Sequence, residues 1–121
     1  MPTELIQVIT TTAEKTDAQT LANLLLEKRL AGCTQISGPI ESSYWWNNRL
    51  DTVREWQLVI KTRRELFEQV AAVITEHHPY DEPEILATPI LHVSAGYRKW
   101  LLEQLSAPLS DLPGEGSLAD E

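Results

Sequence analysis

The segment from Cys33 to Thr62 has the pattern of two long β-strands joined by a tight turn. At its middle, Asn47-Asn48 supplies two residues that tolerate positive φ, which a two-residue hairpin turn requires. Gly38-Pro39 interrupts the first strand and indicates a bulge or bend. One face of the return strand, Val53 to Lys61, carries Trp56, Leu58 and Ile60. The sequence therefore predicts a long antiparallel hairpin.

A strand and a helix precede this hairpin. Leu5 to Ile9 is a short β-branched run that predicts the first strand. The sequence Thr16-Asp-Ala-Gln19 then matches a capping box, in which the side chains of the first and fourth residues bond to orphan backbone N–H groups. Apolar residues at helical spacing follow it. We expect a helix that runs to about Leu30 and stops at Gly32.

A second helix follows the hairpin. It starts at another capping box, Thr62-Arg-Arg-Glu65, and should end near His78 because Pro79 disfavours helical geometry in the residue before it. Its apolar stripe contains Leu66, Val70, Val73, Ile74 and His77. This spacing predicts that the stripe, His77 included, packs under the sheet.

A last strand and a short helix follow the second helix. Ile85 to Val93 predicts a last strand, which Pro89 restricts to a sheet edge or a bulge. Ser94 can cap a short C-terminal helix that includes Tyr97 and Trp100. The order βαββαβ plus a terminal helix predicts an α+β, ferredoxin-like sandwich with an extended hairpin.

The predicted sandwich leaves one sheet face bare. Right-handed crossovers place both main helices on the same face of the sheet. We expect the opposite face to carry Trp and β-branched side chains, and exposed apolar patches of that kind mark association surfaces. The exposed face therefore predicts a homo-oligomer.

Composition limits the classes of partner. The net charge of −8 argues against a nucleic-acid footprint, which needs basic residues gathered on one face. No apolar run approaches the roughly 20 residues of a membrane span, and no basic-then-apolar leader opens the chain, so we expect no membrane partner and a cytoplasmic location. Half of the net charge lies after Ser106, in a Pro-, Gly- and Ser-rich stretch. We expect one domain over residues 1–105 and a flexible acidic tail over 106–121.

The stretch from Thr75 to Glu84 concentrates the chemistry of the chain. It holds two of the three histidines, His77 and His78, with carboxylates on both sides. Imidazole and carboxylate suit Cu(II) and Zn(II), so this is a candidate metal site. The structural alternative is a core position for His77 and a hydrogen-bonded helix end for His78.

Five blocks of the sequence coincide with one family. They are Val8-Ile-Thr-Thr-Thr12, Leu30-Ala-Gly-Cys33, Ser43-Tyr-Trp-Trp46, Ile60-Lys-Thr62 and His77-His-Pro-Tyr-Asp-Glu-Pro-Glu84. In these blocks the chain resembles the CutA divalent-cation-tolerance proteins, from about Leu5 to Trp100. The resemblance implies a ferredoxin-like subunit in a tight homotrimer, similar to the trimeric nitrogen-signalling regulators of the PII type, with no established enzymatic activity.

The resemblance also implies a relation to divalent metal ions, and to copper in particular. The ligands proposed for copper-binding bacterial members are the two adjacent histidines, here His77 and His78, and a cysteine at the end of the first strand. Thr10 stands at that cysteine position, so the thiolate that favours Cu(I) is missing. We therefore expect weak binding of Cu2+ or another divalent cation and no required cofactor.

Two further sets of residues are candidates for contacts between subunits. Aromatic residues are enriched at interface cores, and this predicts the trimer interface at Tyr44, Trp45, Trp46 and Trp56. The rival hypothesis is a regulatory or scaffolding module that binds a small molecule or protein in inter-subunit clefts. The candidate cleft residues are Thr10, Lys61, Tyr80, Glu84 and Trp100. No pattern nominates a catalytic nucleophile, so we expect a protein that is not an enzyme.

Overall fold

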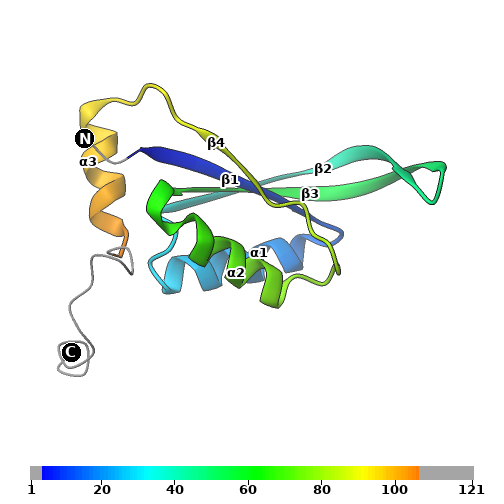
Figure 1. The fold of residues 1–121 in the computed structure, drawn as a ribbon. Helices are drawn as coiled ribbons and strands as arrows, with labels where there is room; N and C mark the ends of the chain where they lie inside the picture. The colour runs from blue at the N-terminus through cyan, green and yellow to red at the C-terminus, as the bar shows by residue number, and fades with distance from the viewer. Residues whose placement is uncertain (1–3, 107–121) are drawn as a thin grey trace.

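The fold is a single antiparallel sheet with helices on one face, seen in a computed structural model that describes residues 4–106. The strand order is β2-β3-β1-β4, with bounds β1 Leu5–Thr12, β2 Cys33–Trp46, β3 Arg49–Arg63 and β4 Leu86–Pro89. Helices α1 (Lys15–Glu27) and α2 (Phe67–His77) both lie on the same side of the sheet, and α3 (Ala95–Gln104) packs at one end (Figure 1). This confirms the predicted α+β, ferredoxin-like arrangement.

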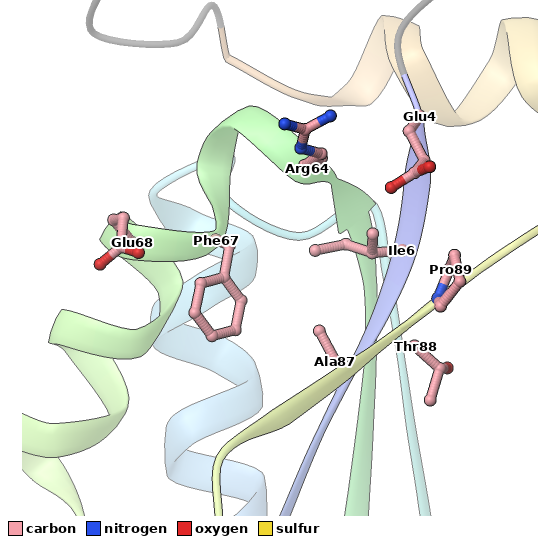
Figure 2. Close-up of a pocket in the computed structure, with 8 residues that line it drawn as sticks. All are labelled: Glu4, Ile6, Arg64, Phe67, Glu68, Ala87, Thr88 and Pro89. Carbon is pink, nitrogen blue, oxygen red and sulfur yellow. The ribbon is translucent and has the colours of Figure 1, made fainter.

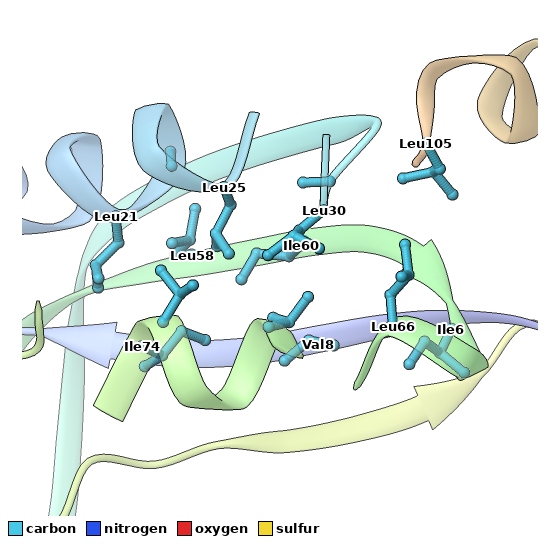
Figure 3. Packing of buried hydrophobic residues seen from close by; sticks show 14 of the residues in the cluster. Ile6, Val8, Leu21, Leu25, Leu30, Leu58, Ile60, Leu66, Ile74 and Leu105 are labelled. Atoms are coloured by element: carbon cyan, nitrogen blue, oxygen red, sulfur yellow. The ribbon is translucent and has the colours of Figure 1, made fainter. Parts of the chain in front are cut away.

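The core lies between the sheet and the two main helices (Figure 3). Its fully buried residues include Val8 of β1, Leu58 and Ile60 of β3, Leu25 of α1 and Ile74 of α2. These residues come from every-second positions of the strands and from one stripe of each helix, as burial of one face requires.

The predicted hairpin is present and is longer than expected on its return strand, which begins at Arg49 instead of Val53. Asn47 and Asn48 have φ of 50° and 61°, as the turn argument requires. The register of β2 against β3 shifts between Ser37 and Ile40, which confirms the irregularity predicted at Gly38-Pro39. The far half of the hairpin projects well beyond the other strands (Figure 1).

Both predicted capping boxes are wrong. Helix α1 begins one residue before Thr16, with Glu14 as its N-cap and no side-chain cap. Thr62 lies within β3 and is fully buried, because the strand continues to Arg63 and a 3-10 turn, Arg64–Leu66, then leads into α2. At Thr62 the strand geometry set by the sheet overrides a local capping pattern. Ser94, in contrast, caps α3 by accepting from the Tyr97 N–H at 3.4 Å.

Two element ends also differ from the prediction. Helix α1 ends at Glu27, because Arg29 adopts φ of 59° and the Leu30 N–H turns back to the Leu25 carbonyl at 2.9 Å. The last strand covers only Leu86–Pro89 of the predicted Ile85 to Val93. Pro89 closes it at the sheet edge, as a residue without a backbone N–H should.

The bare sheet face differs from the prediction in the placement of the tryptophans. Residues that pair directly across neighbouring strands share a face. One such row on the side away from the helices consists of Leu86, Ile9, Val59 and Gln35. Trp56 pairs with the buried Thr12 and so lies on the helix side. The most exposed tryptophans, Trp45 and Trp46, lie near the end of the hairpin and not on the face of the body.

The residue after α3 and its C-cap contacts the body of the fold. The Ser106 N–H donates to the Arg29 carbonyl at 2.9 Å, and the Arg63 guanidinium donates to the Ser106 carbonyl. Apart from Ser106, the predicted acidic tail lies outside the described residues. Within residues 4–106, none of the helices is both long and apolar enough to cross a membrane.

Candidate functional site at the base of the hairpin

His78 connects the end of α2 to the end of β1. It is the C-cap of α2, has extended geometry and is 8% exposed. Its Nε2 lies 2.8 Å from the Thr11 carbonyl oxygen, and its Nδ1 accepts from the Tyr80 N–H at 3.0 Å. A carbonyl can only accept and an amide N–H can only donate, so the proton must lie on Nε2. The ring is therefore a neutral imidazole with both nitrogens occupied.

Tyr80 extends this contact to β3. Its hydroxyl donates to Glu55 Oε2 at 2.8 Å, and its ring centroid lies 4.8 Å from that of His78. Burial, followed by the hydrogen bond to Glu55, raises the pKa of Tyr80 well above the usual range of a phenol. The hydroxyl consequently remains a donor at neutral pH. Glu55 is only 7% exposed, which makes it an unusually buried carboxylate.

Trp56 forms the other side of the same region. The Lys15 ammonium lies 5.4 Å from the Trp56 ring centroid, a cation–π distance. On the neighbouring strand, Gly38 has φ of +152°, and a Cβ built there would lie 2.8 Å from the Trp56 ring. Only glycine fits this position, because the tryptophan ring covers the space that a side chain would occupy.

Of the two structural alternatives for the histidines, the hydrogen-bonded helix end at His78 is confirmed and the core position of His77 is wrong. His77 was expected in the core, but its side chain is 39% exposed and its Nε2 lies 3.8 Å from Glu76 Oε2. His78, the residue beyond the helix, is the buried one. The prediction for His77 failed because it extended the 100° helical spacing to the last residue of the helix, beyond the sheet contact.

The arrangement of this pair limits what it can do to a metal ion. His77 presents an accessible imidazole, whereas His78 would have to break a hydrogen bond to Thr11 or Tyr80 before it could bind an ion. Across residues 4–106, no group of three or more His, Cys, Asp or Glu side chains is placed to hold a metal. Within one chain, His77 and His78 are therefore not arranged to bind one ion together. The nearby carboxylates of Asp81, Glu82 and Glu84 are all exposed.

The candidate cleft residues lie at two ends of the subunit. Thr10 is fully buried and faces the core, and Tyr80 contacts Glu55 near that end of β1. Lys61 pairs with Gln7 at the other end, where its ammonium lies 5.6 Å from the Tyr97 ring. Trp100 belongs to this second group, with its ring 5.6 Å from that of Tyr97. A single subunit thus does not gather the set, and the predicted cleft between subunits stays a prediction.

The predicted interface aromatics also divide into two groups. Tyr44, Trp45 and Trp46 are exposed by 42%, 73% and 63%. Trp56 is instead half-buried against the core, between Gly38 and Lys15. The hairpin end therefore leaves large aromatic surface in water, while Trp56 acts within the subunit.

A separate depression lies at the opposite end of α2, with a volume of 480 Å³ (Figure 2). Ile6, Phe67 and Ala87 line it between α2 and β4, and Glu4, Arg64 and Glu68 surround it. It shares no residue with the His78 and Tyr80 contacts. Of the two regions, the base of the hairpin has the denser polar bonding.

Glu55 is the member of the site that sequence reasoning missed. The alternation of β3 places it on the bare face, where a carboxylate would ordinarily be solvated. Its burial arises because Tyr80, from a loop distant in sequence, reaches it beyond the end of β1. In the sequence, the only local indication of a buried carboxylate was the position of Glu55 next to Trp56 in the strand.

Comparison with known proteins agrees with these observations. Residues 6–104 match the family described as CutA1 divalent ion tolerance protein. The chain is 33% identical over 100 residues to the Divalent-cation tolerance protein CutA of Pyrococcus horikoshii, covering 83% of this chain and 97% of that one. It is 36% identical over 96 residues to Protein CutA 1, chloroplastic, of Oryza sativa, covering 79% of this chain. The chain spans about half the length of that plant relative, 54%.

The fold comparison gives the same result. The crystal structure of CutA1 from Oryza sativa superposes with a TM-score of 0.84 at 34% identity, covering 86% of this chain and 95% of that one. The match over nearly the whole described chain, in both sequence and fold, places this protein in the CutA1 family of divalent-cation tolerance proteins.

Proposed function

We propose that the protein is a non-enzymatic homotrimer that contributes to divalent-cation tolerance by binding copper or a similar divalent ion weakly, with His77 as the leading ligand. The observation that carries the proposal is the projecting hairpin. Trp45, Trp46 and Leu50 are each more than 60% exposed near its end. Apolar surface of this size on a projecting arm is costly in water and favours burial against other subunits.

The histidine geometry supports weak binding in particular. Recruitment of His78 as a second ligand costs one of its two hydrogen bonds, about 1 kcal/mol or more for a buried pair. Thr10 offers no thiolate, so nitrogen and oxygen donors remain, and these suit Cu(II) better than Cu(I). Ligands from neighbouring subunits can complete the coordination if the trimer brings their His77 or acidic residues close.

The assembly is tested by sedimentation velocity. We expect a species of three times the 13.7 kDa chain mass. Replacing Trp45 and Trp46 together by Ser should shift the mass toward monomer. Leu91→Ser is the matched control, because Leu91 is 79% exposed in the loop before α3, away from the hairpin. A monomeric wild-type protein at micromolar concentration contradicts the trimer.

Metal binding is tested by titrating Cu2+ into the intact protein. His77→Ala should remove most of the saturable binding, and His78→Ala should weaken it and also lower stability. His92→Ala is the control, since His92 is the third histidine and lies exposed in another loop. Unchanged copper affinity in His77→Ala would exclude His77 as the leading ligand.

One observation favours a second candidate function, a regulatory module that binds an effector between subunits. Lys61, Tyr97 and Trp100 form a cationic and aromatic surface near α3. Such a surface suits an anionic or aromatic ligand. Isothermal titration of the trimer with small carboxylates and nucleotides, repeated on Lys61→Met, separates this candidate from metal binding.

We also propose a cytoplasmic location, as expected from the sequence. The rice relative is described as chloroplastic, which concerns that protein alone. Fractionation of cells that express the full-length protein tests the location directly.

A further inference from the structure

We propose that the hydrogen bond between Tyr80 and Glu55 is a latch that fixes the direction of the projecting hairpin and couples the loop after α2 to it. The loop, residues 79–85, follows the two histidines. The latch deepens the proposed function, because the hairpin is the surface proposed for assembly. Its local part, however, concerns a single subunit and can be tested without a trimer.

The hairpin needs such a support because of where β1 ends. Thr12, the last residue of β1, pairs with Trp56. Within one chain, and among residues 4–106, β3 pairs only with β2 from Glu55 to the turn. A two-stranded ribbon without a packed face is only marginally stable and twists freely in water. The direction of the ribbon is therefore decided at its base.

The base has a weak point in β2. The pairing of β2 with β3 is interrupted between Ser37 and Ile40, and these residues pair with Gln57 and Glu55. Bulges of this kind bend the strand and disrupt the ladder locally. At the level of Glu55 and Trp56, β3 is thus the one strand that continues unbroken from body to hairpin.

Tyr80 holds β3 at that level. Its hydroxyl reaches Glu55 at 2.8 Å, and its own backbone N–H is fixed by His78, which in turn is bonded to the Thr11 carbonyl. The three bonds form a continuous connection from the end of β1, through the loop, to the first hairpin residue beyond it. Glu55 is 7% exposed, so the bond operates with little competition from water.

The loop therefore cannot move without affecting the hairpin. A ligand that draws His78 or the loop carboxylates away from the body must stretch either the Tyr80 N–H bond or the Tyr80 hydroxyl bond. Loss of the second bond frees β3 at the bulge. In this way an event at the histidines changes the surface that contacts other subunits.

The direct test is amide hydrogen exchange on Tyr80→Phe, which keeps the ring packing on His78 and removes the hydroxyl. We expect hairpin amides in residues 40–46 and 49–55 to exchange about tenfold faster, since a hydrogen bond to a charged group is lost. Amides of the core strand β1, such as Val8, should be unaffected. Tyr97→Phe is the matched control, a tyrosine on α3 whose replacement should leave both regions unchanged.

Glu55→Gln gives a graded second variant. Its side chain keeps an acceptor oxygen for Tyr80 without the charge, so the increase in hairpin exchange should be smaller than in Tyr80→Phe. If Tyr80→Phe does not fold, the exchange of Glu55→Gln alone decides the result. The latch would be overturned if hairpin amides exchange at the wild-type rate in Glu55→Gln. It would also be overturned if hairpin and core amides exchange faster by the same factor.

Sedimentation distinguishes failure of the latch from failure of the proposed trimer. Sedimentation of Tyr80→Phe should show the trimer dissociating at about tenfold higher protein concentration than the wild type, if the hairpin is misdirected. Exchange is compared at concentrations where both proteins have the same mass. A monomeric wild type with faster hairpin exchange in the variant refutes the trimer and leaves the latch standing. A trimeric wild type with unaltered exchange refutes only the latch.

Discussion

Three consecutive threonines at the end of β1 have three different roles. Thr10 is fully buried and its hydroxyl has no partner among the described residues. Thr11 offers its carbonyl to His78. Thr12 is also fully buried, but its hydroxyl donates to the Glu14 carbonyl at 2.7 Å. Identical side chains thus differ in what a substitution would cost.

Thr10 and Thr12 therefore predict opposite effects of the same change. Thr10→Val removes a buried hydroxyl that bonds to none of the described residues, and should stabilise the fold by about 1 kcal/mol. Thr12→Val breaks the bond to Glu14 and should destabilise it by about 1 kcal/mol. Urea unfolding of both variants measures the difference. Equal effects of the two changes would mean that Thr10 is satisfied in solution, for example by a water.

His77 and His78 are neighbours in sequence, but the end of α2 between them gives them different surroundings. His77 is the last helical residue and His78 already has φ of −78° and ψ of 138°. The change of backbone geometry turns His78 toward β1 and leaves His77 in solvent. Helical periodicity could identify the end of α2 through Pro79, but it could not give the direction of the residue beyond.

At the scale of elements, the hairpin was the most predictable part of the chain. Its turn needs positive φ, and Asn47 and Asn48 tolerate it. Its irregularity at Gly38-Pro39 follows from proline and glycine chemistry. The capping box at Thr62 failed because this residue lies in β3, where the sheet fixes the backbone. The one at Thr16 failed because α1 already begins at Lys15, so Thr16 lies inside the helix and is not its N-cap.

Gly38 and Gly96 give a prediction for the elements that contain them. Gly38→Ala should destabilise the fold by about 2 kcal/mol, because φ of +152° and contact with the Trp56 ring both exclude a Cβ. Gly96 lies in α3 with open space at its Cβ, so Gly96→Ala should stabilise by about 0.5 kcal/mol. Thermal unfolding measures both. A tolerated Gly38→Ala would show that the bulge can rearrange.

At the scale of the whole molecule, the subunit exposes its surfaces unevenly. The body buries one face of the sheet under α1 and α2, whereas the hairpin extends into solvent with its aromatic residues near the end (Figure 1). Exposed aromatic surface of this kind is what the proposed trimer would bury. The base of the hairpin, where His78, Tyr80 and Glu55 meet, joins the two parts.

Removal of residues 107–121 tests the predicted domain boundary. We expect the thermal midpoint to shift by less than about 2 °C, because the segment lacks the apolar periodicity that packing requires. A chain ending at Glu103 is the contrast, since it also loses Leu105, which is 9% exposed, and the Ser106 bond to Arg29. If removal of residues 107–121 alone lowers the thermal midpoint by more than about 4 °C, the domain boundary lies later in the chain.

The sequence by itself determined the element order, the hairpin turn, the end of α2 and the family. These features depend on local chemistry: side-chain alternation, residues that accept positive φ, and proline without an N–H. The tertiary structure alone decided which histidine is buried and that Tyr80 reaches Glu55. It also decided that Thr10 faces the core with no hydrogen-bond partner for its hydroxyl within residues 4–106. Each of these depends on residues distant in sequence meeting beyond the end of β1, and no local pattern records which side chains a fold brings together.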